Sequence, residues 1–209
     1  MIKQKSVSYK FNDSNDNELN FFVNKTNFYA FNALINNDTK FCFLYGPKKS
    51  GKSYLSNIWL KKNNAIEYKN NYKDILNLHN NILIDNLIFY DQEKIFHIVN
   101  NCILNNSKIL ITSDIKINSI DFKFNDLSSR LKTFSNLEIN QPNDEMLLAV
   151  LTKLLIDKQF IIKSNEIFEY ILRRVDRSYQ GINEIVKKLD IISLEKKRQL
   201  TIPLIKEIM

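Results

Sequence analysis

The sequence predicts an α/β protein in which helices cover both faces of a parallel sheet and a small all-α part follows. Short apolar runs, typical of strands buried on both faces, occur at Phe41–Tyr45, Ile82–Ile84 and 109–111. Segments with helical spacing separate successive runs, and such alternation indicates a parallel sheet. After Pro142 the strand signals stop and only helical patterns follow.

The helices are predicted from apolar spacing and from the residues at their ends. The segment 91–105, for example, begins with an Asp and has apolar residues at helical spacing. The predicted helices are, in order, 22–34, 53–62, 91–105, 143–158, 164–175, 178–195 and 202–209. We therefore expect a flexible polar arm at 1–19, an α/β domain at 20–141 and a helical domain at 142–209.

Composition sets the class of protein. The chain has 209 residues, 44% of them hydrophobic, which is enough for a packed core. It contains no run of 18 uncharged apolar residues and no secretory signal, so we expect no membrane span. The two cysteines, Cys42 and Cys102, lie inside apolar runs, which favours core thiols in a reduced, cytoplasmic protein.

The formal net charge of +7 suggests an acidic partner such as nucleic acid. However, the lysines are scattered among many asparagines, apart from short clusters at 187–188 and 196–198. No helix-turn-helix, zinc-finger or RNA-binding signature accompanies them. A solvated, lysine-rich surface is therefore the favoured interpretation of the charge.

A phosphate-binding motif follows the first apolar run. The segment Gly46-Pro47-Lys48-Lys49-Ser50-Gly51-Lys52-Ser53 matches the P-loop pattern G-x-x-x-x-G-K-[ST] without a mismatch. The glycines let backbone N–H groups approach phosphate oxygens, Lys52 would neutralise the β- and γ-phosphates, and Ser53 would ligate Mg²⁺. The chain has only 3 glycines, two of which occupy the motif. We therefore predict a nucleotide site formed by residues 46–53 together with Tyr54.

Asp85, at the end of the second apolar run, is the expected Walker B carboxylate, which would hold Mg²⁺ together with Ser53. Most hydrolysing members of this class carry Glu or Asp at the next position, whereas this chain has Asn86. An amide can hydrogen-bond a water molecule but cannot accept its proton. Intrinsic ATP hydrolysis should therefore be very slow.

Polar residues also follow the third apolar run. Ser113 and Asp114 stand where a sensor of the γ-phosphate would lie, although a turn or N-cap pair explains each of them equally well. The histidines, His79 and His97, have no ligand partners at metal spacing and are interpreted as structural residues.

Taken together, these segments resemble the DnaA family of AAA+ proteins, and within it the short regulatory paralogues of the Hda type. The resemblance spans about residues 20 to 209, and the matching segments are 20–27, the P-loop, 82–86 with its Asp-Asn pair, 111–114, 126–131 and 198–208. It implies an AAA+ P-loop domain followed by a helical lid.

The resemblance also implies roles for particular residues. Val23 and Asn24 would lie on the adenine side of the nucleotide, and Arg130 would act in trans on the nucleotide of a partner. The lid arginine of the family falls at Gln180, so either Arg177, one helical turn earlier, replaces it or the contact is absent. A degenerate clamp-binding peptide near the start of the chain would use Gln4, Val7 and Tyr9.

The implied function is control of replication initiation. Such a protein binds ADP or ATP with Mg²⁺ and, with the sliding clamp, stimulates ATP hydrolysis by the initiator DnaA. We expect these two partners, a possible homodimer, no membrane contact and no dedicated DNA-binding domain. The main alternative is a DNA-stimulated AAA+ ATPase such as a helicase loader, and a third is a relative that binds nucleotide only structurally. Asn86 and the lack of a DNA-reading element favour the regulator.

Overall fold

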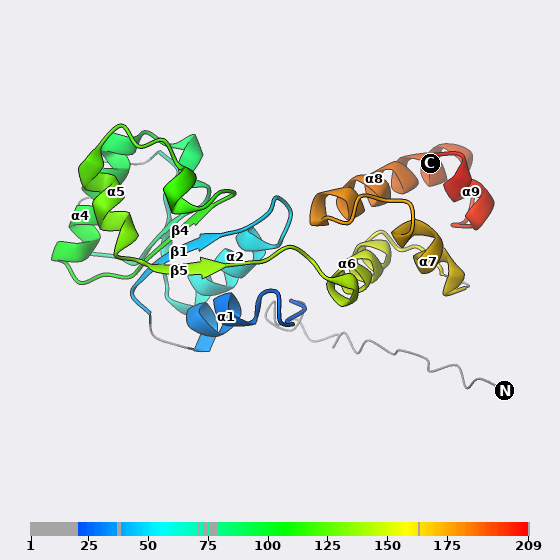
Figure 1. Ribbon diagram of the computed structural model, residues 1–209, viewed down its shortest axis with the longest axis horizontal. Helices are drawn as coiled ribbons and strands as arrows, with labels where there is room; N and C mark the ends of the chain where they lie inside the picture. The colour runs from blue at the N-terminus through cyan, green and yellow to red at the C-terminus, as the bar shows by residue number, and fades with distance from the viewer. Residues whose placement is uncertain are drawn as a thin grey trace.

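The computed structural model describes residues 21–36, 39–70, 72, 75, 79–162 and 164–208. Within these residues, the strands form one parallel sheet in the order β2-β3-β4-β1-β5 (Figure 1). The strands are β1 (Phe41–Tyr45), β2 (Ile66–Glu67), β3 (Ile82–Ile84), β4 (Ile109–Ser113) and β5 (Ser135–Glu138).

Helices precede, connect and follow the strands. Those of the α/β part are α1 (Phe28–Phe31), a π-helical turn (Asn32–Asn36), α2 (Lys52–Lys62), α4 (Gln92–Leu104) and α5 (Asn125–Lys132), with short 3-10 turns at Leu87–Phe89 and Ile117–Ser119. Those of the helical part are α6 (Asp144–Asp157), α7 (Glu166–Leu172), α8 (Tyr179–Lys196) and α9 (Ile202–Lys206). No helix in the described ranges is long and apolar enough to cross a membrane.

The sheet is buried on both faces because successive side chains of a strand point to opposite sides. On β1, Phe43 packs into the core beneath α4 and α5, whereas Cys42 and Leu44 pack into the core beneath α1 and α2. This explains why the strand is a continuous apolar run. The thiols of Cys42 and Cys102 are buried and free, and burial raises the pKa of each to about 12, as expected for core residues.

The strand register places the functional loops at one edge of the sheet. Tyr45, the last residue of β1, pairs with Ser113 of β4, and Ile84 of β3 pairs with Ile111 of β4. The chain therefore leaves β1, β3 and β4 at neighbouring points of the same edge. The P-loop, Asp85 and Asp114 follow these three strands directly.

The helical part, which lies to the right of the sheet in Figure 1, has its own core. Leu147, Leu151 and Leu155 of α6 face α8 and α7 at four-residue spacing, as expected for one helix face. Met146 of α6 and Tyr179 of α8 pack instead into the core beneath α1 and α2. The two parts of the chain are therefore in direct contact.

Most of the predicted elements are confirmed, including β1 and β3 with their exact bounds and the helices after residue 142. The predicted helix at 22–34 is wrong in its first half, because helix α1 begins only at Phe28. The side chain of Asn24 accepts hydrogen bonds from the backbone N–H and the hydroxyl of Thr26, at 2.9 and 2.7 Å. Such local side-chain bonds form a turn that competes with the helix.

Candidate nucleotide site

The P-loop has the backbone geometry that its glycines allow. A Cβ atom on Gly46 would lie 2.6 Å from the carbonyl oxygen of Ile139, so only glycine fits there. Gly51 has a φ of 91°, in the left-handed region, and precedes helix α2 without a side-chain cap. The first N–H groups of α2 therefore have no side-chain partner at this end, the arrangement that suits a phosphate.

Lys52 is held at the floor of the loop. Its Nζ donates hydrogen bonds to the carbonyl oxygens of Gly46 and Pro47, at 2.9 and 2.8 Å. The same Nζ forms an ion pair with Asp114 at 2.8 Å, and the residue is only 8% exposed. A phosphate group entering the loop would find this cation already aimed, but would compete with the Asp114 carboxylate for it.

Asp85 is fixed by a threonine of the neighbouring strand. The hydroxyl of Thr112 donates to Asp85 Oδ1 at 2.6 Å and accepts from the backbone N–H of Asn86 at 2.8 Å. Because a hydroxyl carries one proton, these two bonds define its orientation. Thr112 thereby positions both Asp85 and the residue that follows it.

Lys48, Lys49, Gly51–Tyr54, Asp85, Asn86, Thr112 and Asp114 line one pocket, which we call the phosphate compartment. Ser53 and Asp85 together offer a hydroxyl and a carboxylate oxygen, hard ligands that suit Mg²⁺. Magnesium usually retains several waters, so two protein ligands fit it. Within the described residues, no cluster of three or more His, Cys, Asp or Glu side chains forms another metal site.

Asn86 has a left-handed backbone, with φ 64° and ψ 82°, a conformation that Asn tolerates better than most residues. Its side-chain oxygen is buried, and within the described part of the chain it has no hydrogen-bond partner. The amide lines the phosphate compartment but offers no group that can take a proton from water.

The two predicted sensor residues differ in position. Asp114 lines the phosphate compartment, whereas Ser113 is fully buried and its hydroxyl accepts from the backbone N–H of Ile115 at 3.1 Å. Ser113 therefore does not reach the compartment. Thr112 does, because residues 112 and 114 lie on the same side of the strand end. The alternation of side chains along a strand extended to residue 113 could have predicted this.

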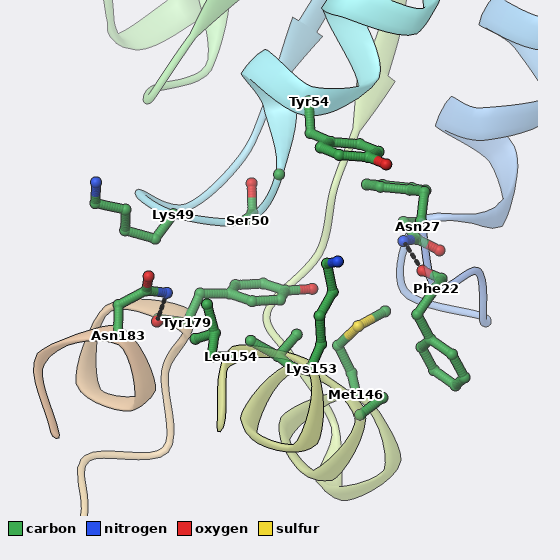
Figure 2. Close-up of a pocket in the computed structure, with 14 residues that line it drawn as sticks. Phe22, Asn27, Lys49, Ser50, Tyr54, Met146, Lys153, Leu154, Tyr179 and Asn183 are labelled. Atoms are coloured by element: carbon green, nitrogen blue, oxygen red, sulfur yellow. Dashed lines mark hydrogen bonds between the residues drawn. The ribbon is translucent and has the colours of Figure 1, made fainter. Parts of the chain in front are cut away.

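A second compartment adjoins the first and is shown in Figure 2. Its walls come from the segment before α1, from the P-loop and α2, and from the lid helices α6 and α8 (Figure 2). The ring of Phe21 stacks on Tyr54 with centroids 5.7 Å apart and on Phe31 at 6.0 Å. Apolar walls with few polar groups suit a flat base and its ribose, and we call this the base compartment. Ser50 lines it with a buried hydroxyl that lacks a partner among the described residues.

The residues predicted on the adenine side are not those that line this compartment. Val23 and Asn24 do not line it, whereas Phe21, Phe22 and Asn27 of the same segment do. Asn24 instead donates to Asn143 Oδ1 at 3.0 Å and to Glu145 Oε2 at 3.1 Å. The side chain of Asn24 therefore connects this segment to the start of α6 and does not line the base compartment.

Arg177 also lies away from both compartments. Its exposed guanidinium forms an ion pair with Asp144 at the start of α6. The lid cation that lines the base compartment is Lys153 of α6, which points toward the P-loop side of the cavity (Figure 2). The resemblance does not predict this lysine, whose Nζ forms an ion pair with Asp157 at 3.5 Å.

Arg130 is exposed on α5, and its Cζ lies 5.6 Å from the centroid of the Phe96 ring on α4. In Figure 1, α4 and α5 lie at the end of the α/β part opposite the lid. Arg130 lines neither the phosphate compartment nor the base compartment. Gln4, Val7 and Tyr9 lie outside the described residues.

Thr112→Val should destabilise the fold, because it leaves the partly buried N–H of Asn86 without an acceptor and removes a bond to Asp85. We expect a loss of roughly 1–3 kcal/mol in the free energy of unfolding, measured by urea denaturation. Thr112→Ser, which keeps the hydroxyl, should retain most of the stability. If Thr112→Val is as stable as the wild type, the hydroxyl bonds do not contribute to stability and this prediction is wrong.

The chain is similar in sequence and in fold to known proteins. Residues 144–209 match the family model of the Hda lid domain. The initiator DnaA of Buchnera aphidicola subsp. Cinara cedri is 29% identical over 158 residues, which are 72% of this chain and 34% of that protein. The chain thus spans about a third of the length of the curated DnaA relatives that it matches.

Solved structures show the same fold. Domain III of the DnaA from Thermotoga maritima superposes with a TM-score of 0.76 at 18% identity, covering 89% of this chain and 92% of that one. The AMPPCP-bound DnaA from Aquifex aeolicus gives 0.68 at 19% identity, covering 89% of this chain and 68% of that one. With its parallel sheet, its P-loop and a segment that matches the Hda lid model, the chain is similar to the AAA+ proteins of the DnaA family and resembles Hda.

Proposed function

We propose that this protein is a nucleotide-binding regulator of replication initiation, which holds ADP or ATP with Mg²⁺ and promotes ATP hydrolysis by the initiator DnaA at the sliding clamp. The convergence of Lys52, Ser53 and Asp85 at one sheet edge, beside a lid-walled base compartment, carries the proposal. The AMPPCP in the Aquifex DnaA structure supports nucleotide binding by the same fold.

In this proposal, Lys52 exchanges Asp114 for the β-phosphate and any γ-phosphate, while N–H groups of the P-loop surround the phosphate chain. Ser53 and Asp85 hold Mg²⁺, which supplies neutralising charge. Thr112 keeps the carboxylate of Asp85 oriented toward that ion. The aromatic wall of Phe21 and Tyr54 excludes water from the base.

Two features favour a regulator over a DNA-stimulated ATPase. Asn86 stands at the edge of the phosphate compartment where an acid would be needed to activate water. Arg130 is exposed on α5, a helix at the end of the α/β part that lies away from the lid in Figure 1, where its side chain is free to enter the site of another molecule. An arginine supplied in trans can accelerate phosphoryl transfer by about 10³ to 10⁵. The clamp contact and a homodimer rest on the resemblance alone.

Lys52→Ala should weaken ADP binding by at least about tenfold, because it removes the charged hydrogen bonds to the phosphates. Isothermal titration calorimetry with MgADP measures the affinity. Lys61→Ala, an exposed lysine of the same helix that lines neither compartment, is the matched control and should bind normally. Failure of the wild-type protein to bind ADP would refute the nucleotide site itself.

Asn86→Asp should raise the slow intrinsic ATP turnover by about tenfold or more, because the new carboxylate can take a proton from the attacking water. The left-handed backbone at this position accepts Asp as readily as Asn. Phosphate release from the isolated protein is measured, with Asn86→Ala as the control that adds no acid. If turnover does not change, hydrolysis is limited elsewhere, for example at the lid, where Gln180 replaces an arginine.

Arg130→Ala should abolish stimulation of ATP hydrolysis by the cognate DnaA in the presence of clamp and DNA. ADP affinity and thermal stability should not change, since the side chain is exposed and remote from the nucleotide compartments. Lys132→Ala, another exposed cation of α5, is the control and should keep the stimulation. The measurement is phosphate release from DnaA preloaded with ATP.

Survival of stimulation in the Arg130→Ala protein would remove the arginine from the mechanism. A wild-type protein that never stimulates DnaA, but hydrolyses ATP when single-stranded DNA is added, would instead support the loader-like alternative.

A further inference from the structure

A groove separates the P-loop from lid helix α8, and both of its walls carry polar side chains. One wall is formed by Lys48 and Lys49 of the P-loop. The other is one face of α8, since its residues follow each other at helical spacing: Gln180, Asn183, Glu184 and Lys187. Helix α6 closes the third side. We call this feature the lid groove.

The lid groove has an excess of positive charge. Within the described residues, Lys48, Lys49 and Lys187 have no carboxylate at ion-pair distance, whereas Lys158 at the α6 side is neutralised by Asp190 at 2.5 Å. The lining carboxylate is Glu184, which accepts a hydrogen bond from Gln180 at 2.7 Å. Three lysines without an ion-pair partner in the described part of the chain thus line the lid groove with a single carboxylate, and an anion would offset this excess of positive charge.

The lid groove is continuous with both nucleotide compartments. It shares Lys48 and Lys49 with the phosphate compartment, and Lys49, Leu154 and Asn183 with the base compartment. Figure 2 shows Lys49 and Asn183 on facing walls at this junction. The ribose of a nucleotide lies between its base and its 5′-phosphates. A substituent on the ribose would therefore leave the two compartments near Lys49.

We propose that the lid groove is a second anion subsite, which receives a phosphate carried by the ribose of the bound nucleotide. Its ligands are nucleotides phosphorylated at the 5′ position and at a second ribose hydroxyl. Lys49 and Lys187 contact the additional phosphate from opposite walls, and Asn183 lies beside it. The subsite rests on the proposed nucleotide site and extends the range of ligands that this site accepts.

The test compares two probes that differ by one phosphate, AMP and adenosine 3′,5′-bisphosphate, by calorimetry on the full chain. The wild type should bind the bisphosphate about tenfold tighter than AMP, as a charge-assisted contact predicts. Lys187→Gln should lose this gain and leave the affinity for AMP unchanged. Lys188→Gln, the adjacent residue that does not line the groove, should keep it. Added salt should reduce the gain, because the contacts are partly exposed.

The outcomes separate the two proposals. If ADP binds but the bisphosphate has no advantage over AMP, or if its advantage survives Lys187→Gln, the subsite is refuted and the nucleotide site stands. If neither AMP nor ADP binds, the proposed function itself fails. A single-stranded oligonucleotide that displaces the bisphosphate from the wild type, and whose own binding requires Lys187, would assign the groove to nucleic acid and refute the subsite.

Discussion

The parallel register of β1, β3 and β4 is the constraint on which the candidate site depends. Because the three strands are neighbours and end within two residues of one another, the P-loop, Asp85 and Asp114 meet although 68 positions of sequence separate Gly46 from Asp114. Hydrogen bonds between the strands fix this level, and the apolar cores on both faces hold the sheet rigid. The geometry of the candidate site therefore follows from strand pairing, and among the residues that line the phosphate compartment only Lys49, Gly51 and Asn86 have a left-handed backbone.

The ammonium group of Lys52 already has hydrogen-bond and ion-pair partners within the protein. Its contacts with two loop carbonyls and with Asp114 spare the folded protein the cost of a buried, unpaired ammonium. The same contacts mean that a phosphate gains only the difference between its own interaction with Lys52 and that of Asp114. Binding energy must therefore also come from the loop N–H groups and from the base compartment. This explains why the site extends beyond the P-loop to the aromatic wall formed by Phe21 and Tyr54.

The sequence predicts what local chemistry determines. Gly46 and Gly51 indicate the P-loop because no other residue fits their backbone, and the run at β1 indicates a buried strand because every position is apolar. The strand β5 could not be predicted from composition, since Leu137 is its single buried residue and pairing with β1 makes it a strand. Likewise, Val23 and Asn24 lie in the expected segment, but the turn made by Asn24 decides which side chains enter the cavity. The position of Asn24 depends on its hydrogen bonds to Asn143 and Glu145 of the lid, which are distant in the sequence.

The contacts with the lid connect the two parts of the chain around the base compartment. Asn24 bonds to Asn143 and Glu145 at the start of α6, while Tyr179 of α8 packs into the core beneath α1 and α2. A ligand in the base compartment touches both parts at once, so it favours the arrangement in which they close upon it. Arg130 lies on α5, away from this junction. In the proposed function, the nucleotide is therefore bound at one end of the protein and Arg130 is presented at the other, so substitutions at one site should leave the other site unaffected.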